Sequence, residues 1–477
     1  MQAHERVGWT NGNRKLRCAW HSLLTRATAA FAMTALSVSL GCVASIPSLR
    51  LPTLGAVVAI GMVLLPLWTV FMAFVLAAVT IPRAGVHVHG IPITVSDILL
   101  VVAIARGAVS GIRLRTLYRW IWYWIFGAIA VIIGLLNTFP LADVMVDFIG
   151  AVGLSFIAPF AAAVVGRENK DGQLIHWLTI AAFVACVIGL LGWLYGPNSL
   201  IVPRIFYSRE KIASAAIANV IWFHGRVIRR AFGAFTNPNA FGAVLDILLP
   251  FALVKSMDNS QGRWLGALTS VMCIVTVIVT FSRGAWLATL VEVCGMLIIL
   301  PNRSSRSKAV PWLLVGSGVV ALVAGSVHVL GARLSNALTS VGTTSRLAIY
   351  IAAAKIIVLN PIGIGFGAGT TYSHGQVHLL RLPLGLFLSA PVSNVFLQVG
   401  SRMGIMGLAI FVAIVIVPLT RQNLASTSRL QFAAIFAVIG FLVHSLVDYF
   451  LIFQEISMLF WLCTGLAVDL RWFRRSE

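Results

Sequence analysis

Arginine is the side chain best suited to binding chemistry in this sequence, and arginines gather in two polar stretches, 196–238 and 332–394. The first stretch holds six basic residues and a single acid, Glu210, and it ends in a cluster of Arg226, Arg229 and Arg230. Guanidinium groups form paired hydrogen bonds with phosphate and pyrophosphate oxygens. We therefore expect a site for an anionic substrate, with attraction to anionic lipid headgroups as the alternative explanation.

The second stretch contains no acidic residue, and its polar side chains include Arg346, His374, His378 and Arg381. Thr343, Thr344 and Ser345 can cap a helix, so we expect one over 345–359, lying at the membrane interface with Arg346 in its first turn. Glycines at 363, 365, 367 and 369 resemble a phosphate-binding loop. No strand precedes them and no Gly-Lys-Ser/Thr follows, so a flexible turn at the membrane surface is the favoured interpretation.

Arg283 is the most informative single residue, because it lies between two apolar runs with almost no loop. An arginine at that depth is costly unless it is paired or hydrated, so it is a candidate functional residue. The alternative is a structural arginine that extends to the membrane surface beside Trp286 as an anchor.

Four further titratable residues fall within apolar runs. His444 and Asp448 are four residues apart, so on a continuous helix over 431–452 they would share one face near its outer end, as a structural pair or as part of a site. Asp246 and Glu292 also lie inside apolar runs. Such residues can mark an ion path, which keeps a transporter among the alternatives.

The elements that position these residues must be membrane helices. Of the 477 residues, 59% are hydrophobic and only 10% are charged, with a mean hydropathy of +0.95, whereas soluble domains have about 25% charged residues. Continuous apolar runs recur at the length that crosses about 30 Å of hydrocarbon, and lipid requires such runs to be helical. We expect an all-α transmembrane bundle of about 12 to 14 spans. The expected spans are 27–46, 53–81, 92–109, 119–139, 146–165, 174–195, 239–254, 264–281, 284–300, 311–331, 395–419, 431–452 and 455–470.

The net charge of +21 does not indicate nucleic-acid binding, because the basic residues are scattered between the apolar runs. Their bias in short loops places both chain ends in the cytoplasm and places 196–238, 332–394 and the turn at 282–284 outside. This orientation requires 53–81 to cross twice or to form a re-entrant hairpin. The six cysteines form no CxxC pair, so neither a zinc site nor a disulfide framework is expected. The basic N-terminus followed by 27–46 predicts an uncleaved first helix rather than a signal peptide.

Several motifs occur in an order that resembles the bacterial O-antigen ligase and polymerase family. They are FGAFTNPNAFG (232–242), FSRGAWLA (281–288), SRLAIYIAAAKIIVLNPIGIGFG (345–367) and SNVFLQVGSRMGIMGL (393–408), with VSDILL (95–100) and HSLVDY (444–449) fitting the same pattern. The resemblance is strongest over about 230–470 and rests mainly on hydropathy before that. It implies a C-type glycosyltransferase fold with its active site and a large loop at the outer face.

The resemblance also implies a function. Members of this family transfer a glycan from undecaprenyl pyrophosphate to an acceptor hydroxyl, without a nucleotide sugar, a cofactor or a required metal. The family's pyrophosphate-binding arginines fall on Arg283 and Arg346, and stabilising the departing pyrophosphate is their expected role. The implied partners are the lipid-linked oligosaccharide, membrane lipids and other membrane proteins of polysaccharide synthesis or export, in the bacterial inner membrane. Arg226, Arg229, Arg230, His374, Arg381 and Asn394 are expected to bind substrate.

One position departs from the family pattern. Ligases carry His-Asn, nine residues and then Gly-x-x-Gly, and here Asn394, Gly404 and Gly407 keep the spacing, but Ser393 replaces the histidine. A neutral serine cannot accept a proton near neutral pH as imidazole can. A polymerase is therefore favoured over a lipid A-core ligase, and the candidate bases are His374, His378, His444 and Asp448.

The alternatives are a ligase with a different base, an inactive relative, and a transporter or flippase of lipid-linked sugars. The sequence predicts an N-terminal transmembrane region over 1–238, an O-antigen ligase-like domain over 239–470 and a cytoplasmic tail over 471–477.

Overall fold

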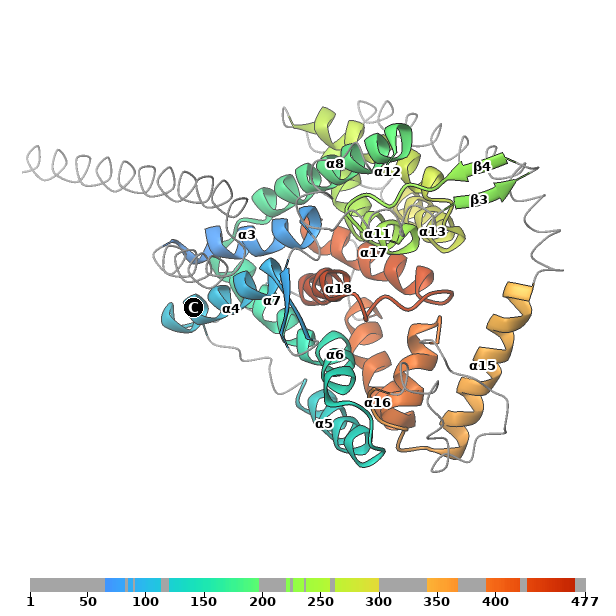
Figure 1. The fold of residues 1–477 in the computed structure, drawn as a ribbon. Helices are drawn as coiled ribbons and strands as arrows, with labels where there is room; N and C mark the ends of the chain where they lie inside the picture. Colours follow the sequence, from blue (N-terminus) through green and yellow to red (C-terminus); the bar gives the residue numbers. More distant parts are fainter. Residues whose placement is uncertain are drawn as a thin grey trace, which may run out of the picture. The chain divides into compact units, whose positions relative to one another are not determined.

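A computed structural model describes part of the chain, and Figure 1 shows its fold. The described residues are 65–81, 85–88, 91–112, 120–196, 220–223, 226–235, 237–257, 262–299, 341–367, 392–420 and 427–467. The predicted spans 27–46 and 311–331 lie outside them, as does the first part of 53–81. The chain divides into two compact units, residues 1–74 with 97–111 and residues 75–96 with 112–477.

Only short segments of the first unit are described. They are the first part of helix α3 (Leu67–Thr80), which starts directly after Pro66, and most of α4 (Val95–Val109). Within the first unit the Arg106 guanidinium donates to the Leu65 carbonyl at 3.0 Å. The β-hairpin of β1 (Gly85–Val88) and β2 (Ile91–Thr94), which precedes α4 in the sequence, belongs to the second unit. The predicted span 92–109 is therefore a helix only from Val95 onward, because its first residues belong to β2.

The second unit contains most of the described helices. They are α5 (Ile121–Leu136), α6 (Leu141–Ala151), the 3-10 helix η2 (Gly153–Phe156), α7 (Ile157–Glu168), α8 (Asp171–Tyr195), α11 (Pro238–Ser256), α12 (Arg263–Thr280), α13 (Arg283–Ile299), α15 (Val341–Leu359), α16 (Val395–Thr420), α17 (Arg429–His444) and α18 (Gln454–Ala467). A second hairpin, β3 (Val220–Phe223) with β4 (Arg226–Arg229), precedes α11. Apart from the two hairpins, the described structure is all-α.

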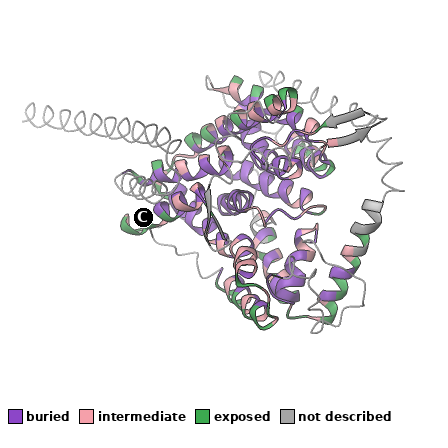
Figure 2. Ribbon diagram, viewed as in Figure 1, coloured by how far each residue is buried: buried purple, intermediate pink, exposed green. Residues whose placement is uncertain are grey.

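The core of this unit is built on α11, α17 and α18. Helix α11 packs against α8, α12 and α17, and α18 packs against α7 and α17; these central helices are buried along most of their length (Figure 2). The Asn237 side chain caps α11 by accepting from the backbone N–H groups of Asn239 and Ala240, and Pro238 occupies the first turn. A capping box of Ser428 and Gln431 starts α17.

Five stretches of the described helices are long and apolar enough to cross a membrane. They are Leu141–Glu168, Asp171–Tyr195, Pro238–Ser256, Arg263–Thr280 and Val395–Ile416. Shorter apolar helices lie at Leu67–Thr80, Ile121–Leu136, Ile349–Leu359 and Arg429–His444. This composition is that of a multi-pass helical membrane protein.

Two predicted spans are interrupted. The span predicted over 146–165 consists of α6, η2 and α7, and α16 is broken at Gly404, where φ is 72°. The freed backbone at this break is paired with residues 361–365: Ile405 N–H donates to the Pro361 carbonyl, and Ile364 and Gly365 donate to the carbonyls of Ser401 and Arg402. Irregular backbone is tolerated at membrane depth where protein satisfies it in this way.

The glycine-rich turn is therefore not the flexible surface turn that its sequence predicts. Gly363, Gly365 and Gly367 all have positive φ, and Gly365 and Gly367 are buried. A side chain at Gly365 would collide with the backbone of Gly134 in α5, and one at Gly363 with the backbone of Arg402. The glycines allow the backbone of this turn to approach α5 and α16 closely.

Two further predictions about helix ends are wrong. Helix α15 begins at Val341, so Thr343, Thr344 and Ser345 lie within the helix and do not cap it. Helix α17 ends at His444, eight residues before the predicted end of the span 431–452. His444 is therefore the last residue of α17 and Asp448 lies in the following non-helical segment, so the two do not share a helix face.

Candidate active site

The turn between α12 and α13 consists of only two residues, Phe281 and Ser282. Phe281 ends α12 in the left-handed region with φ of 53°, which is uncommon for a bulky residue and often marks a functional turn. The Ser282 N–H donates to Thr280 Oγ1 at 3.2 Å, and the Trp286 indole donates to the Val277 carbonyl at 3.0 Å. These bonds hold the turn on both sides.

The tight turn determines where Arg283 lies. Arg283 is the first residue of α13 and is exposed, whereas its neighbours Ser282 and Gly284 are buried. Trp286 is buried and its indole N–H is hydrogen-bonded to α12, so it stabilises the turn. It does not lie at the membrane surface beside the arginine, as the alternative interpretation expected. The turn thus presents one guanidinium group to the exterior at the end of a helical hairpin.

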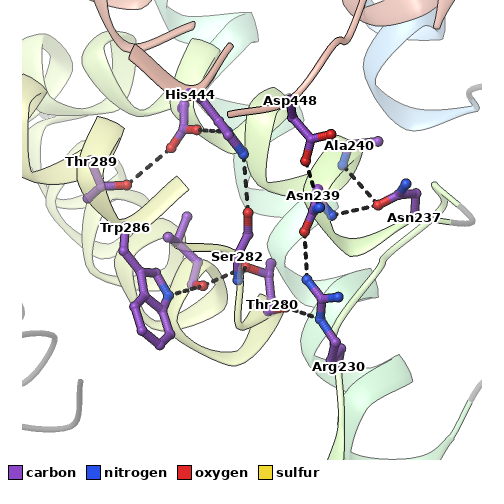
Figure 3. A network of polar contacts seen from close by, with 12 residues as sticks. Arg230, Asn237, Asn239, Ala240, Thr280, Ser282, Trp286, Thr289, His444 and Asp448 are labelled. Atoms are coloured by element: carbon purple, nitrogen blue, oxygen red, sulfur yellow. Dashed lines mark hydrogen bonds and ion pairs between the residues drawn. The ribbon is translucent and has the colours of Figure 1, made fainter. Parts of the chain in front are cut away.

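A buried chain of hydrogen bonds starts at Ser282 in this turn and connects residues of α17, α11 and α13 (Figure 3). Ser282 Oγ is 3.1 Å from His444 Nε2, and His444 Nδ1 is 2.7 Å from Asp246 Oδ2. The Thr289 hydroxyl donates to the other oxygen of Asp246 at 3.1 Å. Asp246, Thr289 and His444 have no exposed surface, and Ser282 is 3% exposed. With Nδ1–H donating to the carboxylate, Nε2 is the acceptor for the Ser282 hydroxyl.

A second chain of hydrogen bonds joins Arg230 to Asp448 (Figure 3). The Arg230 guanidinium donates to the Thr280 carbonyl at 2.7 Å and to Asn239 Oδ1 at 2.6 Å. The Asn239 amide in turn donates to Asp448 Oδ2 at 2.7 Å. The cation and the carboxylate are therefore bridged by one amide, and the chain fixes the start of α11 against the end of α12 and the segment after α17.

Ser393 lies next to the end of α17. Val395 N–H donates to the Ser445 carbonyl at 2.9 Å, and the Asn394 amide donates to the Leu446 carbonyl at 2.8 Å. Asn394 also caps α16, because its Oδ1 accepts from the N–H groups of Phe396 and Leu397. The two residues that follow Ser393 are thus bonded to the segment that begins with His444.

Tyr350 connects α15 to the same place. Its hydroxyl donates to the Ser393 carbonyl at 2.6 Å and lies 3.3 Å from the Leu446 carbonyl. The Ser393 hydroxyl itself has no hydrogen-bond partner in the described part of the chain, since its interactions run through its backbone. Arg346 precedes Tyr350 by four residues on α15, which is about one helical turn.

The structure brings together many of the residues that the sequence singles out. Arg230 and Asp448 are joined through Asn239, and Arg283 directly follows Ser282 of the buried chain. Ser393 and Asn394 lie next to the end of α17, where Asn394 is bonded to Leu446. Arg229 is exposed at the end of β4, and its carbonyl accepts from the Trp193 indole. The side chains of Arg226 and Arg346 lie outside the description, as do His374, His378 and Arg381 altogether.

Sequence reasoning missed the roles of Asn239, Ser282 and Thr289, and it treated Asp246 as an isolated acid. The local signal for Asn239 is its place in the NPNA run, two residues after the helix-capping Asn237. The partnership of Asp246 with His444 joins residues 198 positions apart, and no local pattern indicates it.

A separate polar cluster lies at the break in α16. Arg402 is 4% exposed and is paired with Asp147 of α6 at 3.4 Å, and Asp147 also accepts from the Gly367 N–H at 3.0 Å. The Asn137 amide donates to the Ile364 carbonyl at 2.9 Å. This cluster holds residues 360–367 against the broken helix.

Residues 268–412 match the model of a protein family described as O-antigen ligase. The match runs from α12 into α16 and includes Arg283, Arg346 and Ser393, whereas Asn239, Asp246, His444 and Asp448 lie outside it. No curated protein sequence matches the chain.

Proposed function

We propose that this chain, which carries an O-antigen ligase domain over residues 268–412, is a membrane glycosyltransferase that polymerises lipid-linked repeat units. That domain is shared by O-antigen ligases and polymerases, which act on lipid-linked glycans. The donor in this proposal is an undecaprenyl-pyrophosphate-linked glycan, and the reaction takes place at the outer face of the bacterial inner membrane. The acceptor hydroxyl attacks the anomeric carbon of the donor glycan, and the bond from that carbon to the pyrophosphate oxygen breaks.

The observation that carries the proposal is the presentation of Arg283. Its guanidinium is exposed at the two-residue turn between α12 and α13, at an end of the helical unit where polar chains from α11, α16 and α17 also meet. Negative charge develops on the pyrophosphate as the glycosidic bond breaks, and a fixed cation placed there lowers the barrier. We assign Arg283 and Arg346 to the pyrophosphate.

The other basic residues have different parts in this proposal. Arg226, Arg229, His374 and Arg381 contribute to binding the lipid-linked substrate, and His378 remains a candidate catalytic residue. Arg230 and Asn394 are engaged in hydrogen bonds to Thr280, Asn239 and Leu446, so their contribution includes holding the site in place.

Polymerase is favoured over ligase because of Ser393. The residue lies beside the end of α17, but a serine hydroxyl cannot act as the proton acceptor that the family's histidine would be. In the family that the chain resembles, that histidine is a hallmark of the ligases and not of the polymerases.

The first test uses Arg283→Lys and Arg346→Lys in a deletion strain, with glycan chain length read on gels. Lysine keeps the charge but loses the planar fork that binds two oxygens at once, so we expect loss of polymer at normal protein levels. Arg263→Lys is the matched control, because Arg263 is also the first residue of a helix but lies at the opposite end of α12. Full polymer length in both lysine variants would contradict paired recognition of the pyrophosphate.

A transporter of lipid-linked sugars is the second candidate, and the broken helices favour it. Two candidate spans, Leu141–Glu168 and α16, are interrupted, and the buried Arg402 of one pairs with the partly buried Asp147 of the other. Discontinuous helices often form transporter substrate sites. The side on which lipid-linked units accumulate in the deletion strain separates the two functions. Units accessible to a glycosidase added to spheroplasts support a polymerase, and inaccessible units support a transporter.

A further inference from the structure

We propose that Ser282, His444 and Asp246 form a proton relay that takes up the proton of the acceptor hydroxyl, which would be a new catalytic part for the glycosyl transfer proposed above and rests on it. Ser282 touches the acceptor in this relay, whereas His444 and Asp246 act through it. The relay supplies the base that Ser393 cannot be.

The geometry of the three side chains matches that of a general base held by a carboxylate. Ser282 Oγ and His444 Nε2 are 3.1 Å apart, and His444 Nδ1 and Asp246 Oδ2 are 2.7 Å apart, both within hydrogen-bond reach. The carboxylate sets the tautomer of the ring and stabilises the imidazolium that forms, as in serine hydrolases. Here the serine conducts a proton and forms no bond to the substrate.

The ring of His444 is held by close packing as well as by its two hydrogen bonds. Phe450 packs against it edge-on with ring centroids 4.6 Å apart. A Cβ at Gly242 would lie 3.4 Å from His444 Cε1, and one at Gly284 would collide with the ring at Cδ2 and Nε2. Two glycines from α11 and α13 thus leave a slot for the imidazole, so the base is positioned before substrate binds.

The relay lies next to the place where the donor is expected. Ser282 is the residue before Arg283, so the relay begins in the same two-residue turn that presents the guanidinium assigned to the pyrophosphate. Ser445, the residue after His444, is bonded to Val395, two residues from Ser393. The end of α17 that carries His444 therefore also adjoins the Ser393 position, where the resemblance places the family's histidine.

The proposed step forms one bond, breaks one bond and moves one proton along the relay. The acceptor oxygen forms a bond to the anomeric carbon while its proton passes to Ser282 Oγ, and the Ser282 proton passes to His444 Nε2. The bond from the anomeric carbon to the pyrophosphate breaks, and its electron pair leaves with the lipid pyrophosphate. The imidazolium, paired with the Asp246 carboxylate, returns its proton through Ser282 to water or to the departing pyrophosphate.

Asp448 is the competing base, and the structure gives it a different task. One of its oxygens accepts from the Asn239 amide, which is itself held by Arg230. A carboxylate is also less well matched than imidazole to proton uptake near neutral pH. Asp448→Asn keeps an oxygen that can accept from Asn239, so in the relay proposal it costs much less turnover than loss of His444.

The experiment measures turnover and KM of the purified full-length protein, with lipid-linked repeat units extracted from the deletion strain as substrate. His444→Gln keeps a polar, hydrogen-bonding side chain that cannot take up a proton, and we expect turnover to fall by about 10²- to 10⁴-fold with KM for the lipid-linked unit unchanged. Ser282→Ala should show the same pattern. The double variant should be no slower than the slower single variant, because both changes break one relay.

The controls are His176→Gln on α8 and Ser270→Ala on α12, whose side chains lie away from the turn. Wild-type turnover in His444→Gln or in Ser282→Ala would overturn the relay, and so would a large loss confined to Asp448→Asn. A purely structural role would instead raise KM, lower the melting temperature or give additive losses. If His444→Gln fails to accumulate in the membrane, Ser282→Ala alone decides, since it removes only one oxygen.

Failure of the relay and failure of the proposed function give different results. If the wild-type protein lengthens no glycan and Arg283→Lys changes nothing, the glycosyltransferase proposal fails. If Arg283→Lys abolishes polymer while His444→Gln and Ser282→Ala keep it, only the relay fails.

Discussion

The position of the His444 ring depends on a few close contacts, so small substitutions around it should displace the ring. Its ring lies in a slot formed by Gly242 and Gly284, and its two nitrogens are bonded to Asp246 and Ser282. The sequence shows each of these residues near the middle or the end of an apolar run, but it does not show that they meet. Their contacts depend on how α11, α13 and α17 pack, and packing joins residues too far apart for local patterns to reveal.

Gly284→Ala tests this slot. The added Cβ would lie 2.9 Å from His444 Nε2 and closer still to Cδ2, so the ring must shift away from Gly284 and its alignment with Ser282 is disturbed. Because the bond between Ser282 and His444 would be weakened or lost, we expect polymer synthesis to fall by up to about 10²- to 10⁴-fold, the range of general-base catalysis. Gly172→Ala on α8 is the control, since nothing lies within 4 Å of its added Cβ. Normal chain length in Gly284→Ala would show that the ring need not occupy the slot.

Helices were predictable from hydropathy, but their ends and interruptions were not. The spans predicted over 174–195, 239–254, 264–281, 284–300 and 455–470 correspond closely to α8, α11, α12, α13 and α18. The predicted end of α17 at 452 was wrong because the segment after His444 stays apolar. Tyr449, Phe450 and Leu451 are buried there without forming a helix, so the hydropathy of the sequence does not change where the helix ends. The break at Gly404 is hidden in the same way.

Gly404→Ala tests whether the break in α16 is required. Gly404 has φ of 72° and ψ of −176°, a region that is essentially restricted to glycine, and an added Cβ would collide with the Pro361 carbonyl. We expect a loss of about 1–3 kcal/mol from backbone strain alone. The measurement is the melting temperature of the purified protein in detergent. Gly153→Ala, whose Cβ would make only ordinary contacts at 3.8 Å and beyond, should change it little. Equal melting temperatures for the two variants would show that α16 can run without the break.

At the scale of the whole molecule, the strongest prediction came from the charge of the short loops and from the alternating direction of successive membrane spans. They place the ends of α11, α12, α13, α16 and α17 that carry Asn239, Thr280, Arg283, Asn394 and His444 on one side of the membrane. The structure joins these same ends by hydrogen bonds, as alternating spans require. Which side this is rests on the positive-inside rule alone, because the short loops at the opposite ends, 255–263, 301–310 and 421–429, each carry at least two lysine or arginine residues.

The orientation can be measured with single cysteines in a background from which the six native cysteines have been removed. Ser340→Cys lies just before α15 in a stretch predicted to be outside, and Ser305→Cys lies in the basic loop after α13 that is predicted to be cytoplasmic. A membrane-impermeant thiol reagent applied to intact cells should label position 340 and should reach position 305 only after the membrane is permeabilised. The proposed function requires an outer site, because its donor glycan is presented at the outer face of the membrane. Labelling at 305 but not at 340 would place Arg283 and the Ser282–His444–Asp246 chain on the cytoplasmic side, where a donor presented outside could not reach them.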